Sequence, residues 1–359
     1  MSAHPHGPAH GPAPRHGAGD PAGSVRDAHG RLQAPKTRDV TVVGSVNADL
    51  AIALTALPPA GQTVRGADAV RGPGGKGANQ AVAAARLGRS TAMVAAVGDD
   101  ADGRALRAAL AAEGVDVAHV TAVDAPTGVA VVLVHGGEST IVLSPGANDH
   151  LDAARVRAAA EVVSGARAVL LQCEVPDAAL LAAAGLCTGL LVLDPAPARP
   201  LPAELLRRTD LLVPNAGELA VLAGQDAAAD VDGLVRQARA VRPDGTTIVT
   251  RGALGCVVVT PAGAAEVPAE PADAVDATAA GDSFAAAVVD ALLGGAGLVD
   301  AARWAVRVAA VTVGRAGAAA SLPRREEVEQ DQGGQDQGGQ DQSGQDQSGQ
   351  DRDEREVAR

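Results

Sequence analysis

The sequence predicts an α/β protein with a mostly parallel central sheet, helices on both faces of that sheet, and a smaller second sheet. Short apolar runs alternate with Ala- and Leu-rich stretches of helical pattern, which is the order typical of a parallel sheet with crossover helices. One β-rich segment interrupts this alternation. Both ends of the chain are of low complexity, so we expect the folded part to span about residues 38–323.

The apolar runs are short and bounded by polar residues or glycine, as buried strands are. They are Val40–Val43, Ala92–Val97, Ala168–Gln172, Leu190–Asp194, Leu211–Val213 and Thr247–Thr250. The helical patterns are Ala78–Leu87, Gly103–Glu113, Ala153–Ser164, Leu219–Ala223, Val231–Val241 and Ala285–Leu293. Ligands of open parallel sheets bind beyond the carboxyl ends of the strands, so the polar residues that follow each run are the ones to inspect.

The interrupting segment is rich in β-branched residues. Gly128–Val134 and Thr140–Leu143 are joined by His135-Gly136-Gly137-Glu138-Ser139, which is a hairpin signal. Together with the Pro- and Gly-rich stretch near 51–72, this hairpin could form a small separate sheet.

The two ends of the chain lack the apolar residues that a core requires. Residues 1–37 are rich in Gly, Pro, Ala and His; they form either a metal-binding tail or a solvated extension. Five of the eight histidines lie there, at His4, His6, His10, His16 and His29. From Asp331 to Gln350 a five-residue unit, DQGGQ or DQSGQ, repeats four times without an apolar residue. We therefore expect 1–37 and 324–359 to be disordered.

Composition excludes several classes of function. A net charge of −13 argues against a nucleic-acid partner, which needs a basic face. No apolar run reaches the ~18 residues that suggest a membrane helix, and the N-terminus lacks the apolar stretch of a signal peptide. The three cysteines, Cys173, Cys187 and Cys256, are scattered and typical of reduced thiols. These features predict a soluble, cytoplasmic protein.

The strongest motif is Asp276-Ala277-Thr278-Ala279-Ala280-Gly281-Asp282-Ser283-Phe284, where small residues lead into a helical pattern. Small side chains at a helix start leave backbone N–H groups free to face an anion, and the helix dipole favours negative charge there. Asp282 cannot bind an anion, but beside a phosphate about to be transferred it can accept the proton of an attacking hydroxyl. The alternative is that Asp282 is a plain helix N-cap.

A second helix start carries Gly74-Gly75-Lys76-Gly77-Ala78-Asn79-Gln80. The glycines permit close backbone approach to a ligand, although the spacing is not that of the Walker motif. Lys76 is the only lysine of the predicted folded part. Its ammonium and the amide of Asn79 suit a polyhydroxyl ligand. The alternative is a glycine-rich turn with a solvent-facing lysine.

Polar residues also follow two predicted strands. Asn47 and Asp49 in Gly44-Ser45-Val46-Asn47-Ala48-Asp49 share one face if the chain is extended, and could hold two sugar hydroxyls. An ordinary turn is the alternative. Glu174 could bind a hydroxyl, or be a solvated loop acid.

Two further motifs suit a nucleotide. Asn215-Ala216-Gly217-Glu218 could organise Mg²⁺ and its waters near phosphates, or simply be an acidic helix N-terminus. Thr250-Arg251-Gly252-Ala253-Leu254-Gly255 could bind a phosphate through backbone N–H groups, or be a hairpin turn. The chain has only four asparagines, Asn47, Asn79, Asn148 and Asn215. Three of them fall in the motifs and the fourth follows the β-rich segment, which supports one shared site.

In order and spacing, these motifs resemble the ribokinase (PfkB-type) family of carbohydrate kinases. The matching segments are GSVNADL (44–50), GGKGANQAVAAARLG (74–88), DPAPA (194–198), PNAGE (214–218), TRGALG (250–255) and DATAAGD (276–282). The resemblance covers about 38–323 and implies ATP-dependent phosphorylation of D-ribose at O5, with Asp282 as general base. It also implies a ribokinase-like fold with a lid from 48–72 and 128–143, and a homodimer that pairs through the lids.

The resemblance implies roles for individual residues. The sugar would be held by Asn47, Asp49, Gly75, Lys76, Asn79, Glu174 and Asp282. ATP would contact Asn215, Thr250, Arg251, Gly252, Ala253, Leu254, Gly255 and Gly281. The anion hole would comprise Ala279, Ala280, Gly281 and Asp282. Glu218 would act on Mg²⁺ through water, and a monovalent cation, usually K⁺, would lie at Asp276, Thr278, Thr312, Arg315, Gly317 and Ser321.

The chain departs from the family pattern at three positions. Ala277 stands where the family usually has a small hydroxyl residue, Asp194 replaces the Asn of an NPAPA segment, and Val306 lies where a polar residue near adenine is found. Two other functions stay open. One is a family kinase for fructose, 2-deoxyribose, a ketodeoxy acid or a nucleoside; the other is a non-catalytic sugar- or nucleotide-binding regulator.

Overall fold

The computed structural model describes residues 25–26, 32–33, 36–135 and 138–330. The chain divides into two units, 1–35 and 36–359. In the first unit, strands β1 (Val25–Arg26) and β2 (Leu32–Gln33) pair antiparallel. Most of the segment predicted to be disordered at the N-terminus lies outside the described residues. The five N-terminal histidines and the repeats of 331–350 lie outside them too.

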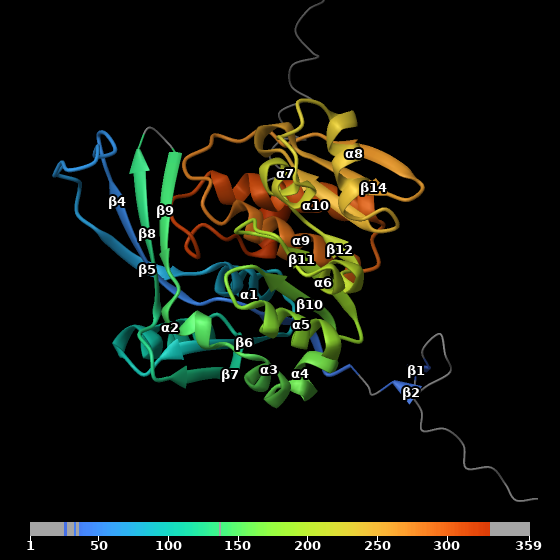
Figure 1. Ribbon diagram of the computed structural model, residues 1–359, viewed down its shortest axis with the longest axis horizontal. Coiled ribbons are helices and arrows are strands. Elements are labelled where there is room, and N and C mark those ends of the chain that lie inside the picture. Colours follow the sequence, from blue (N-terminus) through green and yellow to red (C-terminus); the bar gives the residue numbers. More distant parts are fainter. Residues whose placement is uncertain (1–24, 27–31, 34–35, 136–137, 331–359) are drawn as a thin grey trace, which may run out of the picture. The chain divides into compact units, whose positions relative to one another are not determined.

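The second unit is built on a sheet in which nine strands of the described chain take part, in the order β15-β14-β13-β12-β11-β10-β3-β6-β7 (Figure 1). The bounds are β3 (Arg38–Val43), β6 (Thr91–Gly98), β7 (Asp116–Val123), β10 (Ala166–Gln172), β11 (Leu190–Asp194), β12 (Leu211–Leu212), β13 (Thr246–Thr250), β14 (Cys256–Thr260) and β15 (Gly263–Val267). The pairs β13–β14 and β14–β15 are antiparallel. The other pairs are parallel. The predicted mostly parallel sheet is confirmed.

Helices cover both faces of this sheet. One face carries α1 (Lys76–Arg86), α2 (Ala101–Ala112), α9 (Ala280–Leu293) and α10 (Leu298–Val313). The other carries α3 (Ala153–Ala158), α4 (Ala160–Ser164), α5 (Asp177–Leu186), α6 (Ala203–Arg208), α7 (Ala216–Ala223) and α8 (Val231–Val241). Val42 packs on the first side and its neighbour Val43 on the second. Burial on both sides explains why these strands are continuous apolar runs rather than alternating ones.

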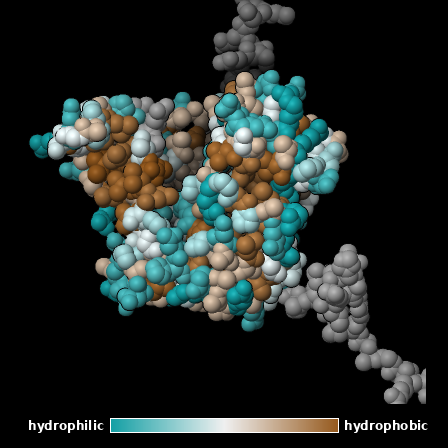
Figure 2. Space-filling model, viewed as in Figure 1, coloured by the Kyte–Doolittle hydropathy of each residue, from teal (hydrophilic) through white to brown (hydrophobic). Residues whose placement is uncertain are grey.

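A smaller sheet of order β5-β4-β8-β9 stands beside the helices at one side of the unit (Figure 1). It comprises β4 (Asn47–Ala53), β5 (Val70–Gly74), β8 (Gly128–His135) and β9 (Glu138–Ser144). The predicted hairpin is confirmed because β8 and β9 pair antiparallel; its turn, 136–137, lies outside the described residues. Figure 2 shows a hydrophobic area over this sheet. Two valines of this sheet are more than half exposed, Val70 of β5 at 66% and Val142 of β9 at 58%, and the strand register places them on opposite faces.

Two details of the fold differ from the prediction. The helix expected over Ala153–Ser164 is interrupted at Ala159, whose φ of −96° and ψ of 19° separate α3 from α4. The packed part of the chain also continues past the expected end at residue 323. Val328 is only 2% exposed, and Arg325 forms an ion pair of 2.6 Å with Asp290.

Two short 3₁₀ helices, η1 (Gly146–His150) and η2 (Gly252–Leu254), follow strand ends. Across the described residues, no helix combines the length and the apolar character that crossing a membrane requires.

Candidate active site

Several strands of the main sheet end at one edge, and candidate residues follow them. β10 leads to Glu174, β11 ends on Asp194, β12 leads to Asn215 and β13 ends on Thr250. Between this edge and the smaller sheet lies a cavity of about 590 Å³. This is the position at which open parallel sheets bind ligands.

The cavity brings together most of the residues that the motifs nominated. Its lining includes Asn47, Asp49, Gly75, Lys76, Asn79, Glu174, Asn215, Glu218, Thr250, Thr278, Ala279, Gly281 and Asp282. On the side of the smaller sheet, Ala130, Val132, Ile141 and Leu143 line it. The smaller sheet therefore covers the cavity mainly with apolar side chains, and Asn47 and Asp49 of β4 are the polar residues that it contributes.

Asp282 lies in the first turn of α9 and is 3% exposed. Its Oδ2 accepts a hydrogen bond from Nδ2 of Asn79 at 2.9 Å, and its Oδ1 accepts one from Nε2 of Gln80 at 3.2 Å. Nζ of Lys76 lies 3.8 Å from the same Oδ1. Asp282 is not the N-cap of the helix, because Ala279 holds that position. The lysine-bearing turn and the carboxylate thus share one pocket.

The backbone before Asp282 is arranged for an anion. Ala279 has a φ of 61°, a left-handed conformation that costs a non-glycine residue roughly 1–2 kcal/mol. The N–H of Ala280 donates to Ala277 over 3.3 Å. Within the described residues, the N–H groups of Gly281 and Asp282 have no acceptor. Unpaired N–H groups at the positive end of a helix attract negative charge.

Lys76 begins α1, and its ammonium lies between two carboxylates. Nζ is 3.7 Å from Oδ2 of Asp194 and 3.8 Å from Oδ1 of Asp282. Burial by itself lowers the pKa of Lys76, but the carboxylates around it outweigh burial and raise the pKa above its usual value; in order of effect they are Asp194, Asp282, Glu174 and Glu218. Lys76 therefore stays a cation at neutral pH, and it is not the solvent-facing lysine of the alternative.

Glycine is required where α1 starts against the connection between β3 and β4. Gly75 has a φ of 90°, and a Cβ on it would lie 2.8 Å from the backbone nitrogen of Asn47. A Cβ on Gly77 would lie 2.6 Å from the nitrogen of Ser45. Because neither glycine has a side chain, the start of α1 can approach the connection between β3 and β4 closely. This contact brings Lys76 next to Asn47.

At the end of the cavity near the smaller sheet, hydrogen bonds fix the polar side chains. Oε2 of Glu174 accepts from the Lys76 N–H at 3.1 Å and lies 3.5 Å from Nδ2 of Asn47. Oδ1 of Asn47 accepts from Nδ2 of Asn148 at 2.7 Å, and Oδ1 of Asn148 accepts from the Val46 N–H at 2.9 Å. Asn148, singled out above only by the rarity of asparagine, therefore holds Asn47 in place.

Among the described residues that line the cavity, two buried side-chain oxygens have no hydrogen-bond partner. They are Oδ1 of Asp49 and Oδ1 of Asn79. Burial, together with the charges of Glu174 and Asp282, raises the pKa of Asp49 to about 7. Buried polar atoms are normally paired, so these oxygens indicate a ligand that donates hydrogen bonds, as sugar hydroxyls do.

The opposite end of the cavity is formed by the motif of α7. The Glu218 N–H donates to Oδ1 of Asn215, and the Asn215 N–H donates to Oε2 of Glu218, both at 2.8 Å. The two residues thus cap the helix, as the alternative proposed, and they also line the cavity.

A hollow of about 360 Å³ adjoins this end and shares Asn215 and Thr250 with the cavity. Arg251, Gly252 and Leu254 also line it. Ala253 and Gly255 belong to the same turn, which needs glycine at 252 (φ 56°) and 255 (φ 79°).

Three of the residues expected to bind a monovalent cation are joined by hydrogen bonds. Asp276 accepts 2.9 Å hydrogen bonds from the N–H groups of Thr278 and Gly317. These bonds outweigh burial and hold the pKa of Asp276 below its usual value.

The other predicted cation residues have different side-chain partners. Thr312 donates to Oγ of Ser283 in α9 at 3.0 Å. The side chain of Arg315 pairs with Glu327 at 2.9 Å, and that of Ser321 donates to the carbonyl of Ala318 at 2.8 Å. Arg315, whose side chain is itself a cation, therefore has only its backbone to offer such a site.

Comparison with known proteins decides the family. Residues 37–325 match the model of the pfkB family carbohydrate kinases. The chain belongs to the pfkB family of carbohydrate kinases. It is 37% identical over 297 residues to the ribokinase of Haemophilus influenzae, covering 81% of this chain and 97% of that relative. It is also 37% identical over 299 residues to the ribokinase of Bacillus subtilis, covering 82% and 99%.

Solved structures agree with this family. The ribokinase of Thermotoga maritima superposes with a TM-score of 0.74 at 31% identity, over 82% of this kinase and 98% of that chain. The ribokinase of Arabidopsis thaliana, solved with ribose and ATP, gives 0.73 at 31% identity, over 82% and 98%. The predicted ribokinase-like fold is confirmed.

Sequence reasoning missed two glutamines of the kinase. Nε2 of Gln80 donates to Asp194 at 2.9 Å and to Asp282 at 3.2 Å, while Gln172 donates to Oε1 of Gln80. The helical period could have found Gln80, because it lies four residues after Lys76 and so shares its face of α1. Nothing in the sequence marks Gln172.

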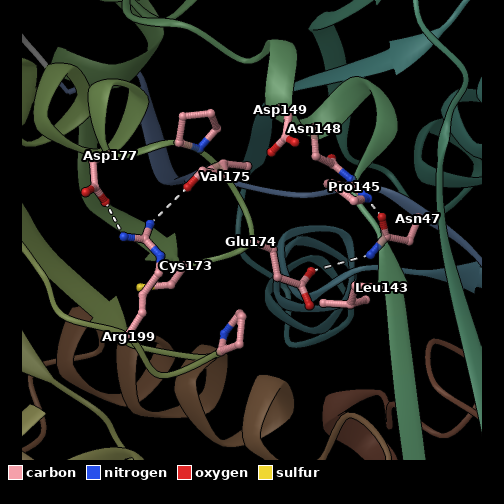
Figure 3. Close-up of a pocket in the computed structure, with 12 residues that line it drawn as sticks. Asn47, Leu143, Pro145, Asn148, Asp149, Cys173, Glu174, Val175, Asp177 and Arg199 are labelled. Carbon is pink, nitrogen blue, oxygen red and sulfur yellow. Dashed lines mark hydrogen bonds and ion pairs between the residues drawn. The ribbon is translucent and has the colours of Figure 1, made fainter. Parts of the chain in front are cut away.

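A second hollow of the kinase, of about 420 Å³, shares Asn47, Leu143 and Glu174 with the cavity (Figure 3). Arg199 lines it, but its guanidinium pairs with Asp177 at 2.5 Å and donates to the carbonyl of Val175 at 3.2 Å. The charge of Arg199 is thus already compensated.

Proposed function

We propose that this kinase transfers the γ-phosphoryl group of ATP to O5 of D-ribose, giving D-ribose 5-phosphate and ADP. One observation carries the proposal: the buried carboxylate of Asp282 lies beside unpaired helix N–H groups, 3.8 Å from the Lys76 ammonium, in a cavity with unpaired polar oxygens. The names of the relatives, and the Arabidopsis ribokinase solved with ribose and ATP, support ribose as the substrate.

Asp282 acts as the general base. It accepts the O5 proton as the bond from O5 to phosphorus forms and the bond from phosphorus to the ADP oxygen breaks. The N–H groups of Ala279, Ala280, Gly281 and Asp282 form the anion hole, which stabilises the charge on the transferred group. The left-handed turn at Ala279 supports this role because it precedes the unpaired N–H groups.

The sugar is held by residues from both sheets. The set is Asn47, Asp49, Gly75, Lys76, Asn79, Glu174 and Asp282. The unpaired oxygens of Asp49 and Asn79 accept hydrogen bonds from hydroxyls, and Lys76 donates to sugar oxygens. The apolar residues of the smaller sheet, which acts as a lid, exclude water and so suppress ATP hydrolysis.

ATP binds at the opposite end, where its phosphates reach Gly281. Asn215 and the turn Thr250–Gly255 contact the nucleotide, and the adjoining hollow of about 360 Å³ suits its adenosine part. Mg²⁺ would neutralise charge on the phosphates, and because such an ion keeps several waters it would need few protein ligands. Glu218, which lines the cavity, would hold it through those waters.

The residues around Asp276 fit a monovalent cation. A carboxylate with a lowered pKa and nearby backbone carbonyls are oxygen ligands, which such ions prefer. Asp276, Thr278, Thr312, Arg315, Gly317 and Ser321 would hold K⁺. Bound there, the ion would stabilise the turn that leads into the anion hole.

The exposed apolar face of the lid supports a homodimer. Val142 of β9 is 58% exposed on the face opposite to its neighbour Ile141, which lines the cavity, and a contiguous apolar area on a sheet favours pairing with a partner. We therefore expect two copies of the chain to associate through their lids, in the cytoplasm, where the unpaired cysteines at 173, 187 and 256 stay reduced.

Turnover on ribose tests the proposal. ADP release should be faster with ribose than with fructose, 2-deoxyribose or a nucleoside, and K⁺ should increase it. Asp282→Asn should lower kcat about 10²–10⁴-fold while ribose and ATP still bind. Asp232→Asn, which removes an exposed carboxylate of α8, is the matched control and should not change the rate. Near wild-type turnover of Asp282→Asn would exclude Asp282 as the base, and binding without turnover on any sugar would identify a regulator.

A further inference from the structure

Asn148 lies where the smaller sheet meets the main sheet, outside the residues assigned a role in the reaction. It belongs to η1, which follows β9, and it is 1% exposed. Backbone hydrogen bonds fix this turn on both sides of Asn148. The Ala147 N–H donates to the carbonyl of Pro126 at 2.8 Å, and the Leu151 N–H donates to the carbonyl of Asn148 at 3.1 Å. The amide of Asn148 therefore stands on a rigid element, which can hold a neighbouring side chain in one orientation.

The backbone of Val46 sets the orientation of the Asn148 amide. The Val46 N–H can only donate, so the Asn148 atom that faces it at 2.9 Å is the oxygen Oδ1. The nitrogen Nδ2 then lies on the other side, where it donates to the carbonyl of Val46 at 3.3 Å and to Oδ1 of Asn47 at 2.7 Å. With the Asn148 amide turned over, its nitrogen would face the Val46 N–H and neither group could accept.

The orientation of Asn148 in turn sets that of Asn47. Oδ1 of Asn47 is held toward Asn148, so its Nδ2 faces toward Glu174 and the cavity that Asn47 lines (Figure 3). The contact from this nitrogen to Oε2 of Glu174 is long, at 3.5 Å, and it engages one of the two amide hydrogens. Asn47 therefore offers the cavity a hydrogen-bond donor and not an acceptor.

A glycine of the smaller sheet makes room for the hydrogen bond between the two asparagines. Gly128 begins β8 and is paired with Asn47 of β4. A Cβ on Gly128 would lie 2.4 Å from Nδ2 of Asn148 and 2.4 Å from Oδ1 of Asn47, which are the two atoms that form the bond. The two amides can meet because residue 128 has no side chain.

We propose that Asn148 is a positioning residue for sugar recognition. It holds the amide of Asn47 so that Nδ2 donates to an oxygen of the sugar, while the unpaired oxygens of Asp49 and Asn79 accept from sugar hydroxyls. If the Asn47 amide turned over, it would lose this donor and set its oxygen against the carboxylate of Glu174. This inference rests on the proposed sugar kinase function and assigns to Asn148 the order of donors and acceptors at one end of the site.

Asn148→Asp tests the proposal, because it keeps an acceptor for the Val46 N–H and removes the donor to Asn47. The new carboxylate can accept from Asn47 only when the Asn47 amide turns over. The KM for ribose should rise about 10–100-fold, as expected when a buried polar group is left without its partner. The KM for ATP should not change, because the nucleotide binds at the opposite end of the cavity. Gln330→Glu, which adds a carboxylate at an exposed position, is the control and should change neither KM.

Gly128→Ala disturbs the same hydrogen bond from a different strand and leaves both asparagines in place. It should also raise the KM for ribose and leave the KM for ATP unchanged, and it serves as the test if Asn148→Asp does not fold. Gly72→Ala is the matched control, because Gly72 lies in β5 of the same sheet and a Cβ there meets no atom within 4 Å. An unchanged KM for ribose would overturn the proposal. An equal rise in both KM values would also overturn it, because that result indicates a general packing role.

A readout without sugar separates this inference from the proposed substrate. The chain has four asparagines, so selective isotope labelling of asparagine gives four side-chain amide signals in an NMR spectrum, and the one missing in Asn148→Asp belongs to Asn148. In wild type the Asn148 amide hydrogens should exchange with deuterium more slowly than those of Asn47, since both have acceptors. Gly128→Ala should lose this protection, and Gly72→Ala should keep it.

Exchange at the same rate in wild type and Gly128→Ala would overturn the proposed positioning of Asn47. A wild-type protein that has the protected Asn148 amide but shows no turnover with ribose would refute the proposed substrate and not the positioning.

Discussion

Replacing Asp49 by Asn tests whether ionised Asp49 destabilises the fold when the cavity holds no ligand. The pKa of Asp49 is raised from 3.8 to about 7, mainly by burial. Each unit corresponds to about 1.4 kcal/mol, so ionised Asp49 destabilises the fold by at most about 4 kcal/mol well above pH 7. The pKa of Asp49 is higher in the folded protein than in the unfolded chain, so the stability that neutral Asp49 preserves is fully present below about pH 4. It is lost as the pH rises through about 7.

At pH 8 the Asp49→Asn variant without ligand should therefore be more stable than wild type by about 2–4 kcal/mol. Unfolding entropy for a domain of this size converts each kcal/mol into roughly 2 °C, so the melting temperature should rise by roughly 4–8 °C. At pH 4 the difference should disappear. The same variant should lose kcat/KM for ribose, because an amide cannot replace the unpaired carboxylate oxygen fully.

Differential scanning calorimetry at the two pH values measures this effect, with Asp232→Asn as the exposed control. A difference in melting temperature that is the same at pH 4 and pH 8 would show that packing, not ionisation, determines the result. A loss of stability at pH 8 would refute the reasoning altogether.

The remaining predictions concern the C-terminal end of the fold. A chain that ends at Gln330 should keep its melting temperature and activity. A chain that ends at Pro323 should melt several degrees lower, because it loses buried Val328 and the Arg325–Asp290 pair. Equal melting temperatures of the two chains would place the end of the fold at residue 323. Asp290→Ala should cost about 3–5 kcal/mol, because it leaves Arg89 and Arg325 without the buried carboxylate that both contact. Trp304, the chain's only tryptophan, donates a hydrogen bond to Asp290, so its fluorescence reports unfolding in urea. The control is Asp300→Ala, which removes an exposed carboxylate and should cost less than about 1 kcal/mol.

The sequence by itself was sufficient for the features that local patterns encode. Continuous apolar runs such as Leu190–Asp194 predicted strands of a sheet covered on both faces, and the observed β11 has the same bounds. The small residues before Asp282 predicted a helix start with unpaired N–H groups. These features depend on neighbours along the chain, so a single sequence reveals them.

Only the tertiary structure decided which side chains meet. Asn79 and Gln80 contact Asp282 from 203 and 202 residues away. Lys76 lies between Asp194 and Asp282 only because β11, α1 and α9 converge at one edge of the sheet. The C-terminal end of the fold was predicted too early for the same reason. The segment after residue 323 is polar, which is typical of a solvated tail, but Arg325 and Val328 contact residues that are distant in the sequence. Charge interactions and burial depend on distance in space, which spacing along the chain does not encode.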